Sequence, residues 1–223
     1  MTLDPLGQMG LTIGRQELQR TRKVARSSVL ETLTTYGGRL AIAIGVTAVS
    51  FGSYYVFTTV GLAYLAIRHV PSAYGLYGTV IGAALSLPVI LLSGRASDVW
   101  GSRPLYMFSA CAMGLWAFAF FPLLDTGSPA LIILAMATGL VAWSVLYGVQ
   151  GAFLPELFPT EVRYTGASLA YQVTGAVGGL IPVASISLLQ SFGTPFSISV
   201  LVLGTALISL VATWAAPETG HLS

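Results

Sequence analysis

The hydrophobic positions of this 223-residue chain form six long runs in place of the short alternating patterns of a soluble domain. Each run is long enough to cross a bilayer, which takes about 20 apolar residues in a helix. Proline, glycine or charged residues interrupt the pattern between the runs, as turns do. We therefore predict an all-α membrane protein, a bundle of six transmembrane helices, at about 39–67, 74–94, 104–123, 130–152, 164–190 and 196–216.

Composition agrees with a lipid surrounding. The chain is 55% hydrophobic and 8% charged, whereas a soluble domain carries about 25% charged residues. A net charge of +2 gives no reason to expect a nucleic-acid partner. The single cysteine, Cys111, lies inside an apolar run, so it forms neither an internal disulfide nor a metal cluster. We expect it to be a packing residue, and we expect no metal or other cofactor.

The polar residues gather at the ends of the chain and on one side of the predicted bundle. We assign 1–38 to a basic cytoplasmic arm, 39–217 to the six-span bundle and 218–223 to a cytoplasmic tail. Of the ten lysines and arginines, only Arg68 falls on the opposite side, in a loop where we expect it and His69 to be solvated. The positive-inside rule then places both termini in the cytoplasm of a multi-pass protein of the plasma (inner) membrane.

Three loop segments carry sequence motifs. Residues 94–104 read GRASDVWGSRP, with an aspartate four positions after a glycine and a second glycine three positions further on. This segment resembles the loop signature of the major facilitator superfamily, although Val99 and Ser102 stand where that family usually has basic residues. Residues 155–168 read PELFPTEVRYTGAS and resemble a loop of the metabolite:proton symporter family, which includes carriers of shikimate, dicarboxylates and betaines. The tail reads PETG at 217–220, in the position of a further family motif.

Members of this superfamily normally have twelve spans in two six-helix halves. The resemblance implies that the chain is the carboxy-terminal half, with the arm corresponding to the loop that joins the halves. It further implies a secondary active transporter for a small polar metabolite of the organic acid or betaine class. Proton coupling is expected only when an amino-terminal half complements the chain. The expected partners are the lipid bilayer, the metabolite, protons, and a complementary six-helix half or a second copy.

Neutral polar residues within the spans supply candidates for a substrate site, since no ionisable side chain lies at a predicted bilayer midplane. On the first span Thr47, Ser50, Tyr54, Thr58 and Gly61 share one helical face. The resemblance places spans one, two, four and five around a central cavity. Small and hydroxyl residues also mediate helix packing, and this alternative stays open except at Gly78 and Gly82 and at Gly175 and Gly179, where we favour packing. The candidate substrate-lining residues are Tyr54, Thr58, Trp143, Tyr147 and Gln172.

Charged residues at the cytoplasmic ends of the spans form a second candidate set. Glu156 and Arg163 resemble a charge pair of the sugar-porter branch, and acids and arginines from two other segments are drawn to the same end. We expect ion pairs that hold one access state and break in the other. The proposed cytoplasmic gate consists of Arg95, Asp98, Arg103, Glu156, Arg163 and Glu218.

Other functions have weaker support in the sequence. An intramembrane enzyme is disfavoured, since neither histidine lies in a span and no glycine-flanked serine faces an embedded base. A channel of the water-channel type would show paired Asn-Pro-Ala motifs, and the chain has only the poor match at 128–130. A nonfunctional truncated fragment, or a membrane assembly partner, would share every motif of a transporter half, so this alternative stays open.

Overall fold

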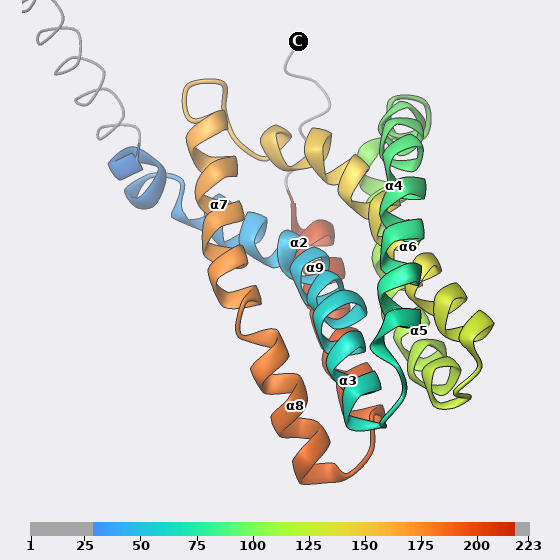
Figure 1. Cartoon of the computed structure of the whole chain (residues 1–223). Helices are drawn as coiled ribbons and strands as arrows, with labels where there is room; N and C mark the ends of the chain where they lie inside the picture. Colours follow the sequence, from blue (N-terminus) through green and yellow to red (C-terminus); the bar gives the residue numbers. More distant parts are fainter. Residues whose placement is uncertain (1–28, 217–223) are drawn as a thin grey trace, which may run out of the picture.

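A computed structural model of the chain describes residues 29–216 and is helical throughout its regular structure (Figure 1). Residues 29–34 are helical and lead into the first span. The remaining elements are α2 (Gly37–Tyr55), the π-helical segment η1 (Val56–Val60), α3 (Gly61–Ile67), α4 (Ser72–Trp100), α5 (Ser102–Asp125), α6 (Pro129–Glu156), α7 (Arg163–Gly178), α8 (Ile181–Phe192) and α9 (Phe196–Ala215).

These elements make six helices that are long and apolar enough to cross a membrane. The first span consists of α2, η1 and α3, the fifth consists of α7 and α8, and each remaining span is a single helix. The predicted fold class, an all-α six-helix membrane bundle, is confirmed. Most of the predicted arm and the whole predicted tail, with Glu218, lie outside the described residues.

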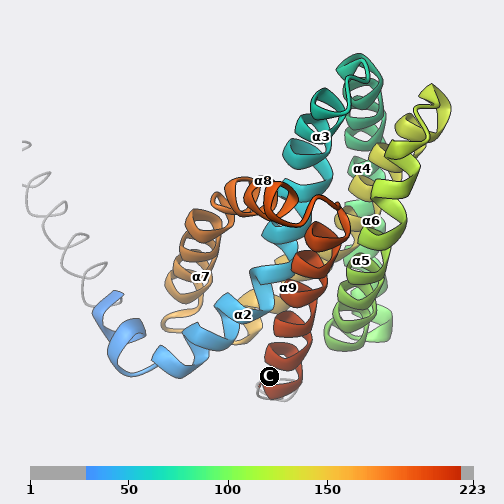
Figure 2. The same ribbon diagram turned by 90° about the horizontal axis from the view of Figure 1, so that it is seen from below.

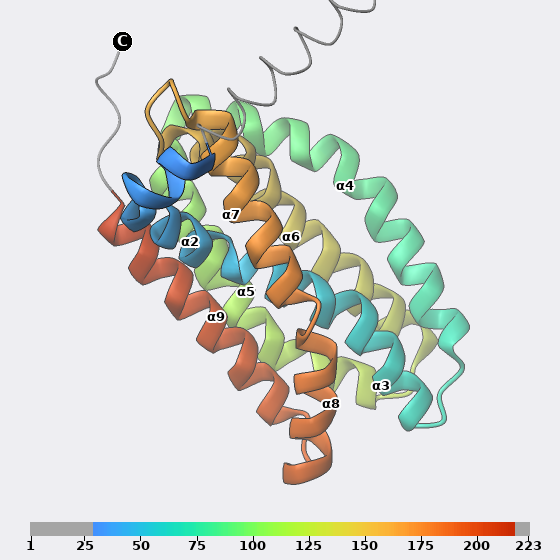
Figure 3. The same ribbon diagram turned by 90° about the vertical axis from the view of Figure 1, so that its left-hand side faces the viewer.

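The first span lies in the middle of the bundle, with other spans packed on either side of it. The pair α7 and α8 lies on one side of α2 and α3, while α4 and α6 lie on the other (Figures 1 and 2). Helix α4 packs chiefly on α6, and α9 packs on both α2 and α5. Figure 3 shows α9 and α4 at opposite edges of the bundle. Gly78 and Gly82 permit the close approach of α4 and α6, since an added Cβ would lie 2.7 Å from Met136 and 2.9 Å from Ala137.

Two spans are irregular at corresponding depths. In the first span the five residues of η1 widen the helix to the i→i+5 pattern, which often occurs at functional sites. The fifth span is interrupted after Gly178, and α8 begins at Ile181 with Pro182 in its first turn. Proline suits a first turn because it has no N–H to donate to a preceding helix. Pro182 therefore lies just after a break between two helices.

The loop predicted at 94–104 is shorter than expected. Helix α4 continues through Arg95 and Asp98 to Trp100, and α5 begins at Ser102. Only Gly101 separates the two helices, with φ of +86°, a conformation that favours glycine. The second glycine of the motif therefore makes the turn, while the aspartate and the arginine project from the last turns of α4.

Candidate functional site

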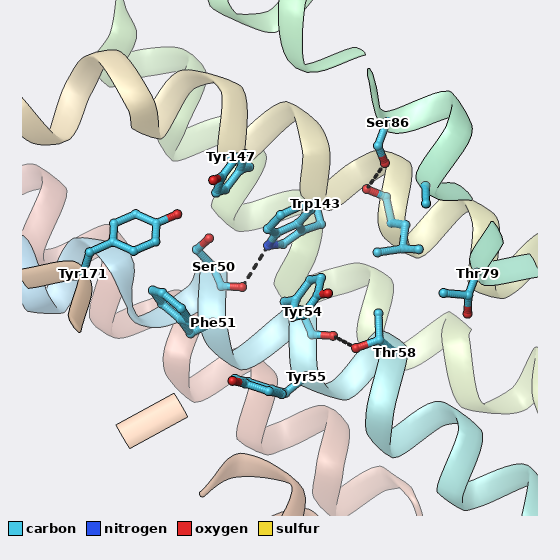
Figure 4. A pocket seen from close by; sticks show the side chains of 12 residues that line it. Ser50, Phe51, Tyr54, Tyr55, Thr58, Thr79, Ser86, Trp143, Tyr147 and Tyr171 are labelled. Carbon is cyan, nitrogen blue, oxygen red and sulfur yellow. Dashed lines mark hydrogen bonds between the residues drawn. The ribbon is translucent and has the colours of Figure 1, made fainter. Parts of the chain in front are cut away.

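A cavity of about 360 Å³ opens between spans one, two, four and five (Figure 4). The four spans that line the cavity are the ones that the family resemblance placed around a central cavity. The other two spans, α5 and α9, contribute no lining residue. None of the lining side chains is charged. They are Ser50, Phe51, Tyr54, Tyr55, Thr58, Thr79, Ala83, Ser86, Leu140, Trp143, Tyr147 and Tyr171.

Aromatic rings form most of the inner wall. Trp143 and Tyr147, one turn apart on α6, stack with their ring centroids 4.6 Å apart. Tyr54 of α2 approaches Trp143 with a centroid distance of 4.9 Å. On the α7 side, Tyr171 meets the edge of Phe51 at 5.0 Å. The rings thus bring together three helices that are far apart in sequence.

Hydrogen bonds fix several of these side chains in place. The indole Nε1 of Trp143 donates to the carbonyl of Ser50 at 2.9 Å, so the ring is held by α2. The Thr58 hydroxyl donates to the carbonyl of Tyr54 at 2.6 Å. Because both donors are occupied within the protein, Trp143 and Thr58 offer a solute a ring face and a methyl group more readily than a hydrogen bond.

Three of the five residues predicted on one face of the first span reach the cavity. Ser50, Tyr54 and Thr58 line it. Thr47, predicted on the same face, instead hydrogen-bonds Thr174 of α7 at 2.7 Å. Gly61 faces Phe120, which would lie 3.0 Å from an added Cβ. The wider turn of η1 rotates the residues after it away from the face predicted at 100° per residue.

Two glycines near the end of α7 decide how closely this helix approaches α2 of the first span. An added Cβ at Gly178 would lie 2.8 Å from the Cβ of Phe51, and one at Gly175 would lie 3.3 Å from its ring. These glycines let α7 lie directly against α2, which brings Tyr171 to the cavity. The break and η1 therefore flank the same aromatic wall.

Four of the five candidate lining residues meet in this cavity: Tyr54, Thr58, Trp143 and Tyr147. The fifth, Gln172, lies in a neighbouring cavity of about 340 Å³, and Tyr171 borders both. Sequence reasoning did not select Phe51, Tyr55 or Tyr171. Tyr171 directly precedes Gln172, and its aromatic ring could have marked it as a lining residue. The prediction instead selected residues that place hydrogen-bonding groups along one face of a helix.

The gate among the candidate cytoplasmic charges stays a prediction. Within residues 29–216, Arg95, Asp98, Glu156 and Arg163 form no ion pair shorter than 4.0 Å with one another. Arg103 donates to the carbonyl of Trp214 at the end of α9. Arg163 reaches the carbonyl of Phe158 at 3.5 Å, while both Arg163 and Asp98 act electrostatically on Glu156. Arg95 and Asp98 are exposed on α4, and Glu218 lies outside the described residues.

Arginines at this end therefore stabilise helix termini. The last carbonyls of a helix lack intrahelical partners and carry partial negative charge, which attracts a guanidinium group. Arg39, at the start of α2, likewise donates to the carbonyl of Leu157 at the end of α6, at 3.3 Å. In this conformation Arg39 and Arg103 each join the start of one helix to the end of another through a backbone carbonyl.

At the opposite end Arg68 is exposed, as predicted, and it also forms an ion pair. Its Nε lies 3.1 Å from Oδ1 of Asp125, and the Tyr64 hydroxyl donates to the same oxygen at 2.7 Å. The first and third spans run in the same direction, so the end of α3 meets the end of α5. His69 remains exposed, with a positive φ of 55°.

The comparisons with known proteins agree with this architecture. A model of the family described as "Sugar (and other) transporter", part of the major facilitator superfamily, matches residues 12–223. The chain belongs to this family. No solved structure matches the chain significantly.

The curated relatives are named as transporters. The chain is 36% identical over 145 residues to the inner membrane metabolite transport protein YhjE of Escherichia coli, covering 65% of this chain and 32% of that protein. It is 26% identical over 211 residues to the proline/betaine transporter of Escherichia coli, covering 93% of this chain and 41% of the relative. It is 33% identical over 134 residues to a putative metabolite transport protein of Haemophilus influenzae, covering 60% of this chain and 30% of that protein. The chain thus spans between about a third and two fifths of the length of these relatives.

Proposed function

We propose that this chain is the carboxy-terminal half of a secondary active transporter for a small polar metabolite, and that its aromatic cavity binds an alkylated ammonium group. The observation that carries the proposal is an uncharged cavity, walled by aromatic rings, at the meeting of spans one, two, four and five. The relatives named as proline/betaine transporters support this solute class.

The chemistry of the cavity favours such a cation. The ring faces of tryptophan and tyrosine attract alkylated ammonium groups, by about 0.5–2 kcal/mol each according to how far the site is desolvated. Trp143 and Tyr147 stack on each other, so the exposed outer faces of the pair and the nearby ring of Tyr54 are the available partners. A site without charged side chains suits a solute of zero net charge, because neither partner leaves an unpaired ion in the membrane.

The cavity of this half is open on one side. Tyr54 and Tyr147 remain 38% and 37% exposed, although both lie on the wall of the cavity. Alternating access moves one half of a transporter against the other around a site at mid-depth. A complementary six-helix half, or a second copy, would close the open side, and it would also have to supply the ionisable group for proton coupling.

Substitution in the aromatic wall tests the ammonium site. We expect Trp143→Leu to weaken equilibrium binding of radiolabelled glycine betaine by about tenfold in lipid nanodiscs, since it removes one cation–π partner. Trp214→Leu is the matched control, because Trp214 is 73% exposed on α9, away from the cavity. Equal binding by the two variants and the unchanged chain would contradict the proposed site.

Reconstitution tests the proposal that the chain is a half. The purified chain alone in liposomes should not accumulate glycine betaine in response to a proton gradient, since it has no second half to move against. Accumulation that depends on the gradient and is lost in Trp143→Leu would show that the chain is a complete coupled transporter, contrary to the proposal.

The proposed location is the inner membrane with both termini in the cytoplasm, in line with the distribution of arginine and lysine. Single cysteines at the exposed positions Glu161 and Thr126, in a Cys111→Ala background, test this orientation. In intact cells an impermeant maleimide should label the cysteine at Thr126 and leave the one at Glu161 unlabelled. The reverse result would invert the proposed topology.

A further inference from the structure

A second cavity lies beside the aromatic one, nearer the end of the bundle that carries Glu156 and Arg163. It has a volume of about 340 Å³ and is bounded by the last turns of α6 and the first turns of α7. Tyr171 lines both cavities. Its side chain extends from α7 toward Tyr147, with which it interacts electrostatically (Figure 4). Tyr171 thus forms a common wall.

The second cavity is lined by the hydrogen-bonding side chains of Gln150, Ser168, Tyr171 and Gln172 and by the apolar residues Leu154, Pro155 and Ala167 with Gly151. Gln150 of α6 is only 1% exposed, and its amide Nε2 has no hydrogen-bond partner within the described part of the chain. Its Oε1 lies 3.5 Å from the Tyr106 hydroxyl, which donates a shorter bond of 2.7 Å to the carbonyl of Val46. Gln172 and Ser168 line the same cavity from α7 and are exposed.

These side chains together are suited to an oxyanion. Amide NH₂ groups and a hydroxyl donate hydrogen bonds, and a carboxylate offers two acceptor oxygens. No carboxylate side chain lines the cavity. A buried donor without an acceptor is unfavourable, so a turn of the Gln150 side chain toward the cavity would let its buried amide donate to an incoming acceptor. The nearest charges along the chain, Glu156 and Arg163, are opposite in sign and act on each other.

We propose that this second cavity is a carboxylate subsite for a zwitterionic solute. The ammonium of the solute lies against the aromatic rings on one side of Tyr171, and its carboxylate lies among Gln150, Ser168 and Gln172 on the other. The inference rests on the proposed function, which supplies the ammonium. It explains how this half could select a zwitterion from a simple cation without an arginine at mid-depth.

Comparing two solutes in equilibrium binding to the purified full chain in nanodiscs tests the subsite. Glycine betaine carries both groups, whereas tetramethylammonium carries the cation alone. The unchanged chain should bind glycine betaine more tightly than tetramethylammonium by about tenfold, the effect expected of one or two hydrogen bonds to a charged acceptor. Gln150→Leu and Gln172→Leu should each remove most of this preference and leave tetramethylammonium binding unchanged.

The controls separate a binding role from a structural one. Gln190→Leu changes an exposed glutamine on α8, in the same span but outside both cavities, and should keep the full preference. Gln150→Leu should not lower the melting temperature, since it removes a buried group that lacks a partner for its Nε2. Ser168→Ala should give a smaller loss of preference than either glutamine variant.

The outcomes distinguish this inference from the proposed function. If Trp143→Leu weakens binding of both solutes while the glutamine variants keep the preference for glycine betaine, the carboxylate subsite is wrong and the ammonium site stands. A preference absent from the unchanged chain, or an equal loss for both solutes in the glutamine variants, also overturns the subsite. If the unchanged chain binds neither solute, the ammonium site fails and the subsite fails with it.

Discussion

Spans one and five differ from spans three and six in regularity and in position. The first contains a π-helical segment and the fifth is broken after Gly178, and both line the aromatic cavity. The third and sixth, α5 and α9, are each one continuous helix and contribute nothing to that cavity. Irregular backbone in a membrane is stable where it is buried in protein or lines a cavity. The irregular spans one and five therefore line the site together with spans two and four, and the regular spans three and six support it from outside.

The third span supports the π-helical segment of the first span through direct contact. Phe57, within η1, is fully buried and meets Phe120 of α5 with a centroid distance of 4.8 Å. Ser199 of α9 in turn donates to the carbonyl of Ala117 of α5 at 2.7 Å. One side of the first span thus faces the cavity with Tyr54 and Thr58, and the other side rests on the regular pair. We expect stability to depend mainly on the second contact and solute binding on the first.

The largest effect should follow from weakening the support. Phe120→Ala should lower the free energy of unfolding by about 3 kcal/mol, because it removes a fully buried ring from a packed contact. Phe108→Ala, on the same helix but 72% exposed, should change it by less than about 0.5 kcal/mol. Denaturation of the purified chain in mixed micelles measures both. Similar losses in the two variants would break the distinction between a supporting and a lipid-facing surface of α5.

An intermediate effect is expected at the break in the fifth span. Gly178→Ala should lower the free energy of unfolding by about 1–3 kcal/mol, since the new Cβ would lie 2.8 Å from the Cβ of Phe51. It should also weaken glycine betaine binding, because α7 and Tyr171 must move away from α2. Gly179→Ala is the matched control: its nearest contacts are 3.4 Å or longer, to carbonyls of α7 itself. Equal behaviour of the two alanine variants would show that the close approach at Gly178 does not position Tyr171.

The smallest effect should come from the ion pair that joins an irregular span to a regular one. Arg68→Ala should cost about 0–1 kcal/mol of unfolding free energy, as the side chains of Arg68 and Asp125 are 55% and 32% exposed. Asp125→Ala should cost more, about 1–2 kcal/mol, because it also removes the acceptor of the Tyr64 hydroxyl, whose residue is 3% exposed. A double-mutant cycle at low and high salt separates the two contributions. Equal costs would mean that the Tyr64 hydrogen bond contributes nothing measurable.

The prediction of the site was limited because a shared helical face does not show which neighbouring helix each residue meets. At 100° per residue, Thr47, Ser50, Tyr54, Thr58 and Gly61 share a face, but the structure sends Thr47 to α7 and Gly61 to α5 and α6. The choice of polar residues also favoured hydrogen-bonding groups, two of which, in Thr58 and Trp143, are occupied by backbone carbonyls. Gln172 was selected for its amide and lies in the second cavity.

The sequence by itself determined the six spans and their fold class, because lipid requires long apolar segments whose backbone groups are all paired within a helix. It also determined Gly78 and Gly82 as packing positions, since small residues between helices of a membrane bundle have few other roles. Only the tertiary structure decided that Phe51, Tyr55 and Tyr171 join Tyr54, Trp143 and Tyr147 in one wall. These rings come from three helices, and their meeting depends on how those helices pack, including the close contact of α7 with α2 at Gly175 and Gly178. This packing is a long-range outcome that local hydrophobic patterns do not encode.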